Sequence, residues 1–164
     1  MRLSDGVIQC KPFILSIILV LGNAMPDPHH LQRFVDAQAS CFAQVRSELA
    51  AGEKRTHWMW FIFPQLEGLG SSPMAQRFAI SGMDEAKAYL AHPVLGVRLR
   101  DCTSLVNAAS GRSVEDIFGY PDNLKFHSSV TLFAQASHPE NNVFDEALKK
   151  YFNGLPDNAT TDRL

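Results

Sequence analysis

The sequence predicts an all-α fold, a single compact domain of several short helices around an aromatic-rich core. Apolar side chains recur at three- and four-residue steps in several segments, which is the period of an α-helix. No run alternates apolar and polar residues over many positions, and no Asn-Gly or Asp-Gly pair lies between two strand-like segments. The length of 164 residues suits one domain with a sizeable core.

The first predicted helix spans residues 29–51. Pro28 suits the start of a helix, and Gly52 suits its end. The residues at helical steps, which we expect on the buried face, are Leu31, Phe34, Val35, Gln38, Phe42, Val45 and Leu49.

Five further helices are predicted along the rest of the chain, over residues 83–91, 93–109, 113–119, 122–136 and 142–152. Pro93 breaks one helix and begins the next. Ser113 and Asp116 resemble a capping box, and Gly154 ends the last helix.

Two segments leave a strand open as the alternative. Residues 57–63 and 128–133 both contain side chains that favour β-structure.

The amino-terminal segment differs from the rest of the chain. The apolar run FILSIILVL covers residues 13–21, with Arg2 and Lys11 before it. This outline is typical of a secretory signal peptide, and the run is shorter than the ~20 apolar residues of a membrane span. Three interpretations stay open: a signal peptide, translation that starts at Met25 rather than Met1, and a structured or membrane-associated segment.

We treat residues 1–25 as an extension outside the fold and residues 28–164 as the domain. The domain contains two cysteines, Cys41 and Cys102, a number that suits reduced thiols in the cytosol better than disulfides. A cytoplasmic location is therefore predicted, with export as the alternative if the first 24 residues are a true signal peptide.

The charge balance argues against a DNA partner. The chain has 15 Lys and Arg and 17 Asp and Glu, a net charge of -2, and residues 26–164 have 13 basic and 16 acidic side chains. An overall basic surface is therefore excluded, and binding of RNA would need a local patch in which Trp and Arg stack on bases. No membrane contact is predicted for the domain, and the oligomeric state stays open.

Residues 53–72, EKRTHWMWFIFPQLEGLGSS, combine a dense aromatic block with polar side chains and a Gly-rich turn. We expect most of the aromatic rings to pack in the core. Polar groups set among them also indicate a pocket with aromatic walls, where Arg binds carboxylate or phosphate and an indole stacks on a base. The candidate ligand-binding residues in this segment are Arg55, His57, Trp58, Trp60, Gln65 and Ser71.

A second polar patch lies at residues 119–131, GYPDNLKFHSSVT. On a helix, Lys125 shares a face with Ser128 or Ser129. These residues are candidates for an anion site, or for a Ser nucleophile with a Lys base. Helix caps and exposed lysines are the structural alternative.

The sequence contains no CxxC, HExxH, GxSxG, Walker or GxGxxG pattern, and the histidines of the domain lack the i, i+4 spacing of metal ligands. No metal and no cofactor are expected. Catalytic residues stay unassigned, and the patterns leave open whether the chain is an enzyme.

The chain resembles the family called domain of unknown function 1810. The segments that carry the resemblance are RFVDAQ (33–38), KRTHWMWFIFPQLEGLGSS (54–72), YLAHPVLGVRL (89–99), IFGYPDNLKFHSSVTLF (117–133) and FDEALKKYFNG (144–154). The resemblance implies a small, all-helical, intracellular domain without an established activity. Some genomes label the family calpastatin, but calpastatin repeats are disordered peptides, which this aromatic-rich chain does not resemble. The sequence given ends with DNATTDRL (157–164), so the last helix of the family is expected to be short or incomplete here.

Two hypotheses for function follow. The first is a protein that binds, or acts on, a small anionic metabolite or nucleotide in an aromatic-walled pocket. The second is a non-catalytic protein-interaction module in which the polar side chains are surface or structural groups. Convergence of Arg55, His57 and Lys125 in one concavity would favour the first hypothesis, and their separation would favour the second.

Overall fold

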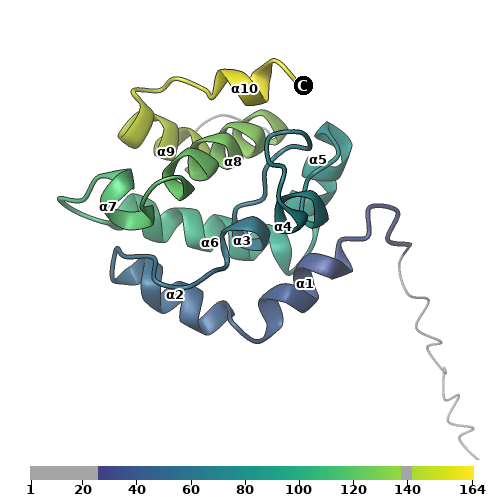
Figure 1. Ribbon diagram of the computed structural model, residues 1–164, viewed down its shortest axis with the longest axis horizontal. Coiled ribbons are helices and arrows are strands. Elements are labelled where there is room, and N and C mark those ends of the chain that lie inside the picture. Colours follow the sequence, from purple (N-terminus) through teal and green to yellow (C-terminus); the bar gives the residue numbers. More distant parts are fainter. Residues whose placement is uncertain (1–25, 138–141) are drawn as a thin grey trace, which may run out of the picture.

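The computed structural model describes residues 26–137 and 142–164, and these residues form ten helices and no strand (Figure 1). The only β-pairing among them is an isolated parallel bridge between Leu66 and Ile80. The predicted all-α fold is therefore confirmed, whereas the prediction for residues 1–25 lies outside the described residues. The helices are α1 (Gln32–Ala39), α2 (Phe42–Ala50), α3 (Met59–Ile62), α4 (Pro73–Arg77), α5 (Met83–Ala91), α6 (Leu95–Ala108), α7 (Val114–Phe118), α8 (Asp122–Ala136), α9 (Val143–Phe152) and α10 (Asn158–Thr161).

Helices α6 and α8 form the centre of the molecule. Helix α8 packs against α5, α7, α9 and α10, and α6 packs against α2, α5 and α9. In Figure 1, α1 and α2 lie along the lower edge and α10 along the upper edge, so that both central helices are covered. No helix in the described part of the chain is long and apolar enough to cross a membrane.

Aromatic rings fill the core, as the sequence predicted. The Phe126 ring of α8 meets Phe63 edge-on, with centroids 5.0 Å apart, and stacks on Phe118 at 4.8 Å. On the other side of the core, Phe34 of α1 meets Tyr89 of α5 edge-on at 5.1 Å. Such pairs add ~0.5–1.5 kcal/mol each beyond the burial of their apolar surface.

The single helix predicted over residues 29–51 is wrong, because α1 and α2 are separate helices. The helix is interrupted at Ser40 and Cys41, where the Cys41 φ angle of -120° is not helical. The break turns the chain, so that α1 contacts α3 while α2 contacts α6 (Figure 1). The apolar spacing continues across this interruption, because the apolar residues of both helices pack against the same core. The spacing alone therefore does not reveal that there are two helices.

The other predicted helices are confirmed, with ends that differ by at most two residues. The capping box is present: Asp116 N–H donates to Ser113 Oγ at 3.1 Å, and Ser113 N–H donates to the Asp116 carboxylate at 2.8 Å. Residues 57–63 and 128–133 are not strands, since α3 and α8 occupy them. Their β-favouring side chains are buried among helices, and this tertiary packing outweighs the local preference.

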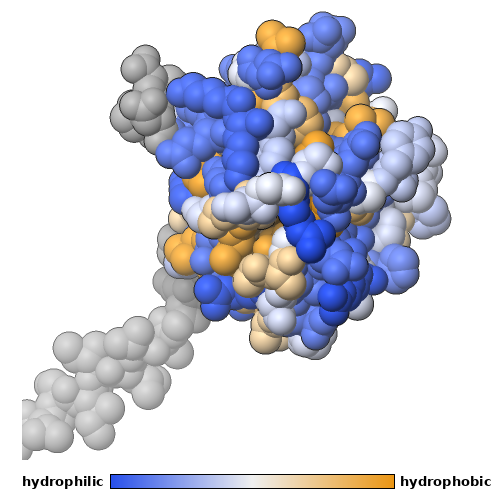
Figure 2. Space-filling view, turned by 90° about the vertical axis from the view of Figure 1, so that its left-hand side faces the viewer, coloured by the Kyte–Doolittle hydropathy of each residue, from blue (hydrophilic) through white to orange (hydrophobic). Residues whose placement is uncertain are grey.

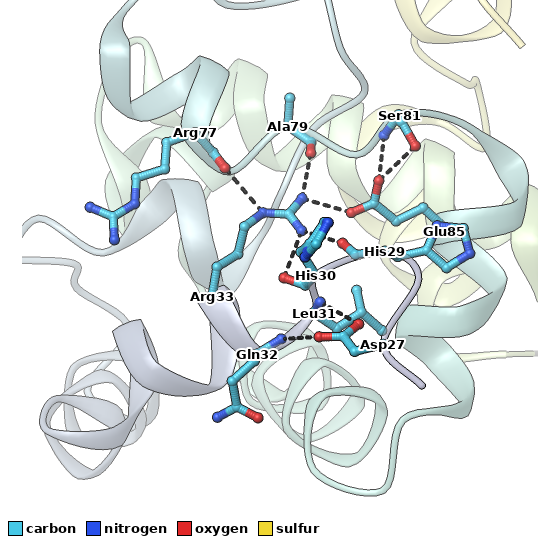
Figure 3. Close-up of polar contacts among 10 residues, drawn as sticks. All are labelled: Asp27, His29, His30, Leu31, Gln32, Arg33, Arg77, Ala79, Ser81 and Glu85. Atoms are coloured by element: carbon cyan, nitrogen blue, oxygen red, sulfur yellow. Dashed lines mark hydrogen bonds and ion pairs between the residues drawn. The ribbon is translucent and has the colours of Figure 1, made fainter. Parts of the chain in front are cut away.

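Arg33 joins the start of the domain to the segment between α4 and α5 (Figure 3). Its guanidinium donates to the carbonyls of His29 and His30, to those of Arg77 and Ala79, and to the Glu85 carboxylate, with a shortest N–O distance of 2.6 Å. Every guanidinium nitrogen is therefore used within the fold, which identifies Arg33 as a structural residue.

The face seen in Figure 2, which is the left-hand side of Figure 1, is largely hydrophilic. Its hydrophobic atoms gather in separate patches rather than in one broad area.

Candidate functional site

A cavity of about 570 Å³ lies between the α3–α4 loop, the first half of α8 and the start of α10. Five of the nine residues that the sequence selected line it. They come from both predicted patches and are Trp60, Gln65, Ser71, Lys125 and Ser128. The fold therefore joins two segments that are more than 50 residues apart in the sequence.

The other four selected residues do not line this cavity. Trp58 is 1% exposed, packs near Phe63 and Phe118, and donates its indole N–H to Glu48 at 2.8 Å. Ser129 is fully buried.

Arg55 and His57 are exposed in the loop before α3, and Arg55 pairs with Glu53 at 2.9 Å. Arg55 and His57 thus do not converge with Lys125 on this cavity.

The loop that leads to Trp60 is held by one carboxylate. Glu48 of α2 accepts hydrogen bonds from the Arg55 and Thr56 amides, from the Thr56 hydroxyl and from Trp58 Nε1, all between 2.7 and 3.1 Å. Burial alone would raise the pKa of Glu48, but these bonds and one from Gln44 lower it to about 2. The ionised Glu48 fixes residues 53–58, and with them the position of α3.

Two lysines share one carboxylate at the wall of the cavity. Lys54 Nζ and Lys125 Nζ each lie 2.8 Å from a different oxygen of Asp122. Burial alone would raise the pKa of Asp122, and the two lysines lower it overall. The cluster of Lys54, Lys125 and Asp122 therefore carries one excess positive charge.

Lys125 presents this charge to the cavity. Its Nζ lies 5.1 Å from the centre of the Trp60 ring, within the range of a cation–π contact. The Lys54 side chain is only 9% exposed and lies over Trp58 instead. Lys125 is therefore the lysine of the pair that can meet a ligand.

A carboxylate lies at the α10 side of the cavity. Asp157 Oδ2 accepts hydrogen bonds from Ser128 Oγ at 2.9 Å and from the Thr160 hydroxyl and amide at 2.6 and 3.1 Å. Burial would raise the pKa of Asp157, but these donors and nearby His127 lower it overall. Asp157 is thus an ionised group that also caps α10.

His127 completes this side of the cavity. Its ring stacks on Phe152 with centroids 3.8 Å apart, and its Nε2 lies 2.9 Å from the Leu155 carbonyl oxygen. Because a carbonyl oxygen only accepts, Nε2 carries the proton in the neutral ring. His127 therefore ties α8 to the segment that carries Asp157.

Apolar side chains form much of the remaining wall, among them Leu69, Pro121 and Leu124. Trp60 and Gln65 also line a second cavity of about 300 Å³ on the far side of Gly70 and Ala75. The Trp60 ring thus borders two adjoining cavities.

The sequence did not select Lys54, Asp122, His127 or Asp157 for this site. Lys54 and Asp122 lie within the two polar segments, residues 53–72 and 119–131, but no spacing in the sequence pairs them. Asp157 precedes Thr160 by three residues, which is a signal of an N-cap rather than of a cavity. Within the described ranges, no group of three or more His, Cys, Asp or Glu side chains is placed to hold a metal ion.

Comparison with known proteins places the sequence in a family. The family described as "Protein of unknown function (DUF1810)" matches residues 28–164. The chain belongs to this family. A similar solved structure is that of a conserved hypothetical protein from Mycobacterium tuberculosis, which is 56% identical in sequence and has a TM-score of 0.82. The match covers 84% of this chain and 98% of that one. A comparison with curated proteins finds no match.

Proposed function

We propose that this DUF1810 domain binds a small anionic metabolite or nucleotide in the cavity lined by Trp60, Lys125 and Ser128. The observation that carries the proposal is the excess positive charge of the two lysines on Asp122. Lys54 alone would neutralise the Asp122 carboxylate. The positive charge of Lys125 is therefore not compensated there and can attract an anionic ligand. An ammonium has three N–H donors, and the hydrogen bond described for Lys125 uses one of them.

The shape and the walls of the cavity support the same proposal. A volume of about 570 Å³ suits a metabolite, since ligand pockets of ~300–1,000 Å³ are typical. Trp60 offers an aromatic edge or face to a planar group, and Gln65 and Ser71 offer neutral hydrogen-bonding groups beside it. A ligand with an anionic group and a ring would use both features.

The test combines thermal shift with tryptophan fluorescence against nucleoside monophosphates, sugar phosphates and dicarboxylates. A binder at 100 times its Kd stabilises the folded state by about 2.7 kcal/mol. We expect the Lys125→Ala variant to weaken binding of any such anion about tenfold or more. Lys87→Ala, which removes an exposed lysine on α5, is the matched control and should bind as the wild type does.

Fluorescence assigns the site. The Trp60→Phe variant should lose the ligand-dependent change in emission, while Trp58, buried against Glu48, remains as the constant background. The proposal fails if no anion in the panel raises the melting temperature, or if Lys125→Ala binds as tightly as Lys87→Ala.

We keep a protein-interaction module as the second candidate. Arg55 and His57 lie outside the cavity on an exposed loop, which is the separation that favours this alternative. A partner that loses affinity for the Arg55→Ala variant and keeps it for Lys125→Ala would support an interaction surface on that loop.

A further inference from the structure

Asp157 uses only one of its two carboxylate oxygens inside the fold. The three hydrogen bonds described for this carboxylate, from Ser128 and from the hydroxyl and amide of Thr160, all end on Oδ2. No hydrogen bond to Oδ1 occurs among the described residues, and Asp157 lines the cavity. A half-buried, ionised carboxylate with a spare acceptor is placed to receive a donor from a ligand.

The positive and negative groups of the cavity lie about one helical turn apart. Lys125 and Ser128 stand at i and i+3 on α8, and residues at this spacing have Cβ atoms ~5–6 Å apart. Ser128 Oγ in turn lies 2.9 Å from Asp157 Oδ2. A single metabolite can therefore reach Lys125 with one group and Asp157 with another.

This arrangement restricts which anions suit the cavity. An anion without hydroxyl groups, bound at Lys125, would leave Asp157 Oδ1 without a donor, and no hydrogen bond would offset the repulsion between its charge and that carboxylate. A ligand with hydroxyl groups would instead donate to Oδ1. A ligand ammonium could also pair with Oδ1, but a hydroxylated ring would in addition pack against Trp60, which lines the same cavity.

We infer that the cavity selects hydroxylated anions such as sugar phosphates, with the anionic group at Lys125 and a ligand hydroxyl on Asp157 Oδ1. This inference rests on the proposed function, because it assigns the second half of the same ligand. Asp157 is then the specificity-determining residue, and Lys125 is the main anion-binding residue.

The experiment compares two phosphates of similar shape by isothermal titration calorimetry on the full chain. Ribose 5-phosphate carries hydroxyl groups on a five-membered ring, whereas cyclopentylmethyl phosphate has a carbon ring without them. We expect the wild type to bind ribose 5-phosphate at least tenfold more tightly. O-phosphoethanolamine, which carries an ammonium group, is the third probe and should bind more weakly than ribose 5-phosphate.

The Asp157→Asn variant tests the role of the carboxylate without removing the cap. Asn is a good N-cap, and its oxygen is needed by the Thr160 amide, so its NH2 group would replace Oδ1 at the cavity. An acceptor becomes a donor, and we expect the preference for ribose 5-phosphate to fall below about threefold. Asp162→Asn, an exposed carboxylate after α10, is the matched control and should keep the preference. Circular dichroism and the melting temperature check that both variants fold.

Each outcome separates the inference from the proposed function. Equal binding of both ring phosphates by the wild type overturns the inference and leaves anion binding at Lys125 in place. Tightest binding of O-phosphoethanolamine, or an unchanged preference in Asp157→Asn, overturns it as well. Absence of binding by all three phosphates and by inorganic phosphate overturns the inference, and the proposed function fails with it if no anion of the thermal-shift panel binds either.

Discussion

Glu48 is the residue on which the geometry of the aromatic block depends. It is 3% exposed, and it gathers donors from the two backbone amides and two side chains of the loop that precedes α3. A buried carboxylate is stable only when such donors replace water. Because the loop leads into α3, which carries Trp60, Glu48 supports one wall of the cavity from a distance.

Replacement of Glu48 by Gln should destabilise the domain. The amide offers one acceptor where the carboxylate offered two, so that some of the loop N–H groups lose their partner at a cost of about 3 kcal/mol. Urea denaturation of Glu48→Gln and of Glu146→Gln, an exposed residue on α9, measures this cost. A loss in Glu48→Gln no larger than that in Glu146→Gln would contradict the role given to this carboxylate.

Acid should unfold the domain in part through the same residue. Glu48 takes up its proton near pH 4.5 in the unfolded chain but only near pH 2 in the folded one. Between these values the unfolded state binds more protons, so the free energy of unfolding falls as the pH falls from about 5 to about 2. Glu48→Gln should show a shallower decline over this window, as measured by urea midpoints at a series of pH values. Parallel declines would assign the acid sensitivity to other groups.

At the scale of elements, Gly96 sets how closely α6 follows α5. A Cβ atom at this position would overlap the carbonyl oxygen of Leu90 and approach its carbonyl carbon at 2.8 Å. Leu90 belongs to the last turn of α5, and its backbone cannot move without shifting that helix. The two helices therefore pack by backbone contact at this point.

Gly96→Ala should destabilise the domain, because the steric overlap with Leu90 outweighs the gain from the higher helix propensity of Ala. We expect a loss of about 2–4 kcal/mol, because overpacking displaces backbone rather than a flexible side chain. Gly82→Ala is the matched control, since its φ of 162° is extended and nothing lies within 4 Å of an added Cβ. Thermal unfolding of both variants decides the point, and equal melting temperatures would show that α5 and α6 can separate freely.

The helices show where periodicity is a sufficient guide and where it is not. Residues 83–91, 122–136 and 142–152 have the spacing, first-turn acids or end signals that predicted helices with nearly correct limits. No Pro or Gly, the usual sequence signals of a helix end, lies at the break between α1 and α2. Next to the break, the buried Gln38 amide donates to the Phe61 carbonyl at 2.8 Å and to Tyr89 Oη at 3.2 Å, contacts with residues far along the sequence that no helical spacing indicates.

For the molecule as a whole, the described helices enclose one aromatic-rich core. The buried core residues of the described part of the chain run from Leu31 to Leu148 and lie within the region that matches the DUF1810 family. We expect a protein that starts at Met25 to have the same free energy of unfolding as the full chain, within about 0.5 kcal/mol, when both are measured by urea denaturation. A drop of more than about 1 kcal/mol would show that residues 1–24 contribute to the fold.

The sequence predicted two of the segments that line the cavity, but it did not predict that they meet or that Asp157 joins them. The aromatic segment and the Lys125 patch each stood out by residue type, and five of their residues do line one cavity. Asp157 could not be found in this way, because an Asp three residues before a Thr is an ordinary helix cap. Its place beside Ser128, 29 residues earlier, arises only when α10 packs against α8.

Helical spacing and end signals are local properties of the chain, so the amino-acid pattern was enough to predict the helical class, most helix limits and the location of the aromatic core. Local patterns do not show which aromatic residue lines the cavity, because that depends on how the helices pack. Trp58 and Trp60 stand two positions apart in the same short segment, yet Trp58 is buried against Glu48 and Trp60 lines two cavities. The choice depends on where α2, α7 and α8 place Glu48, Phe118 and Lys125 around this segment, and those positions are set by long-range packing.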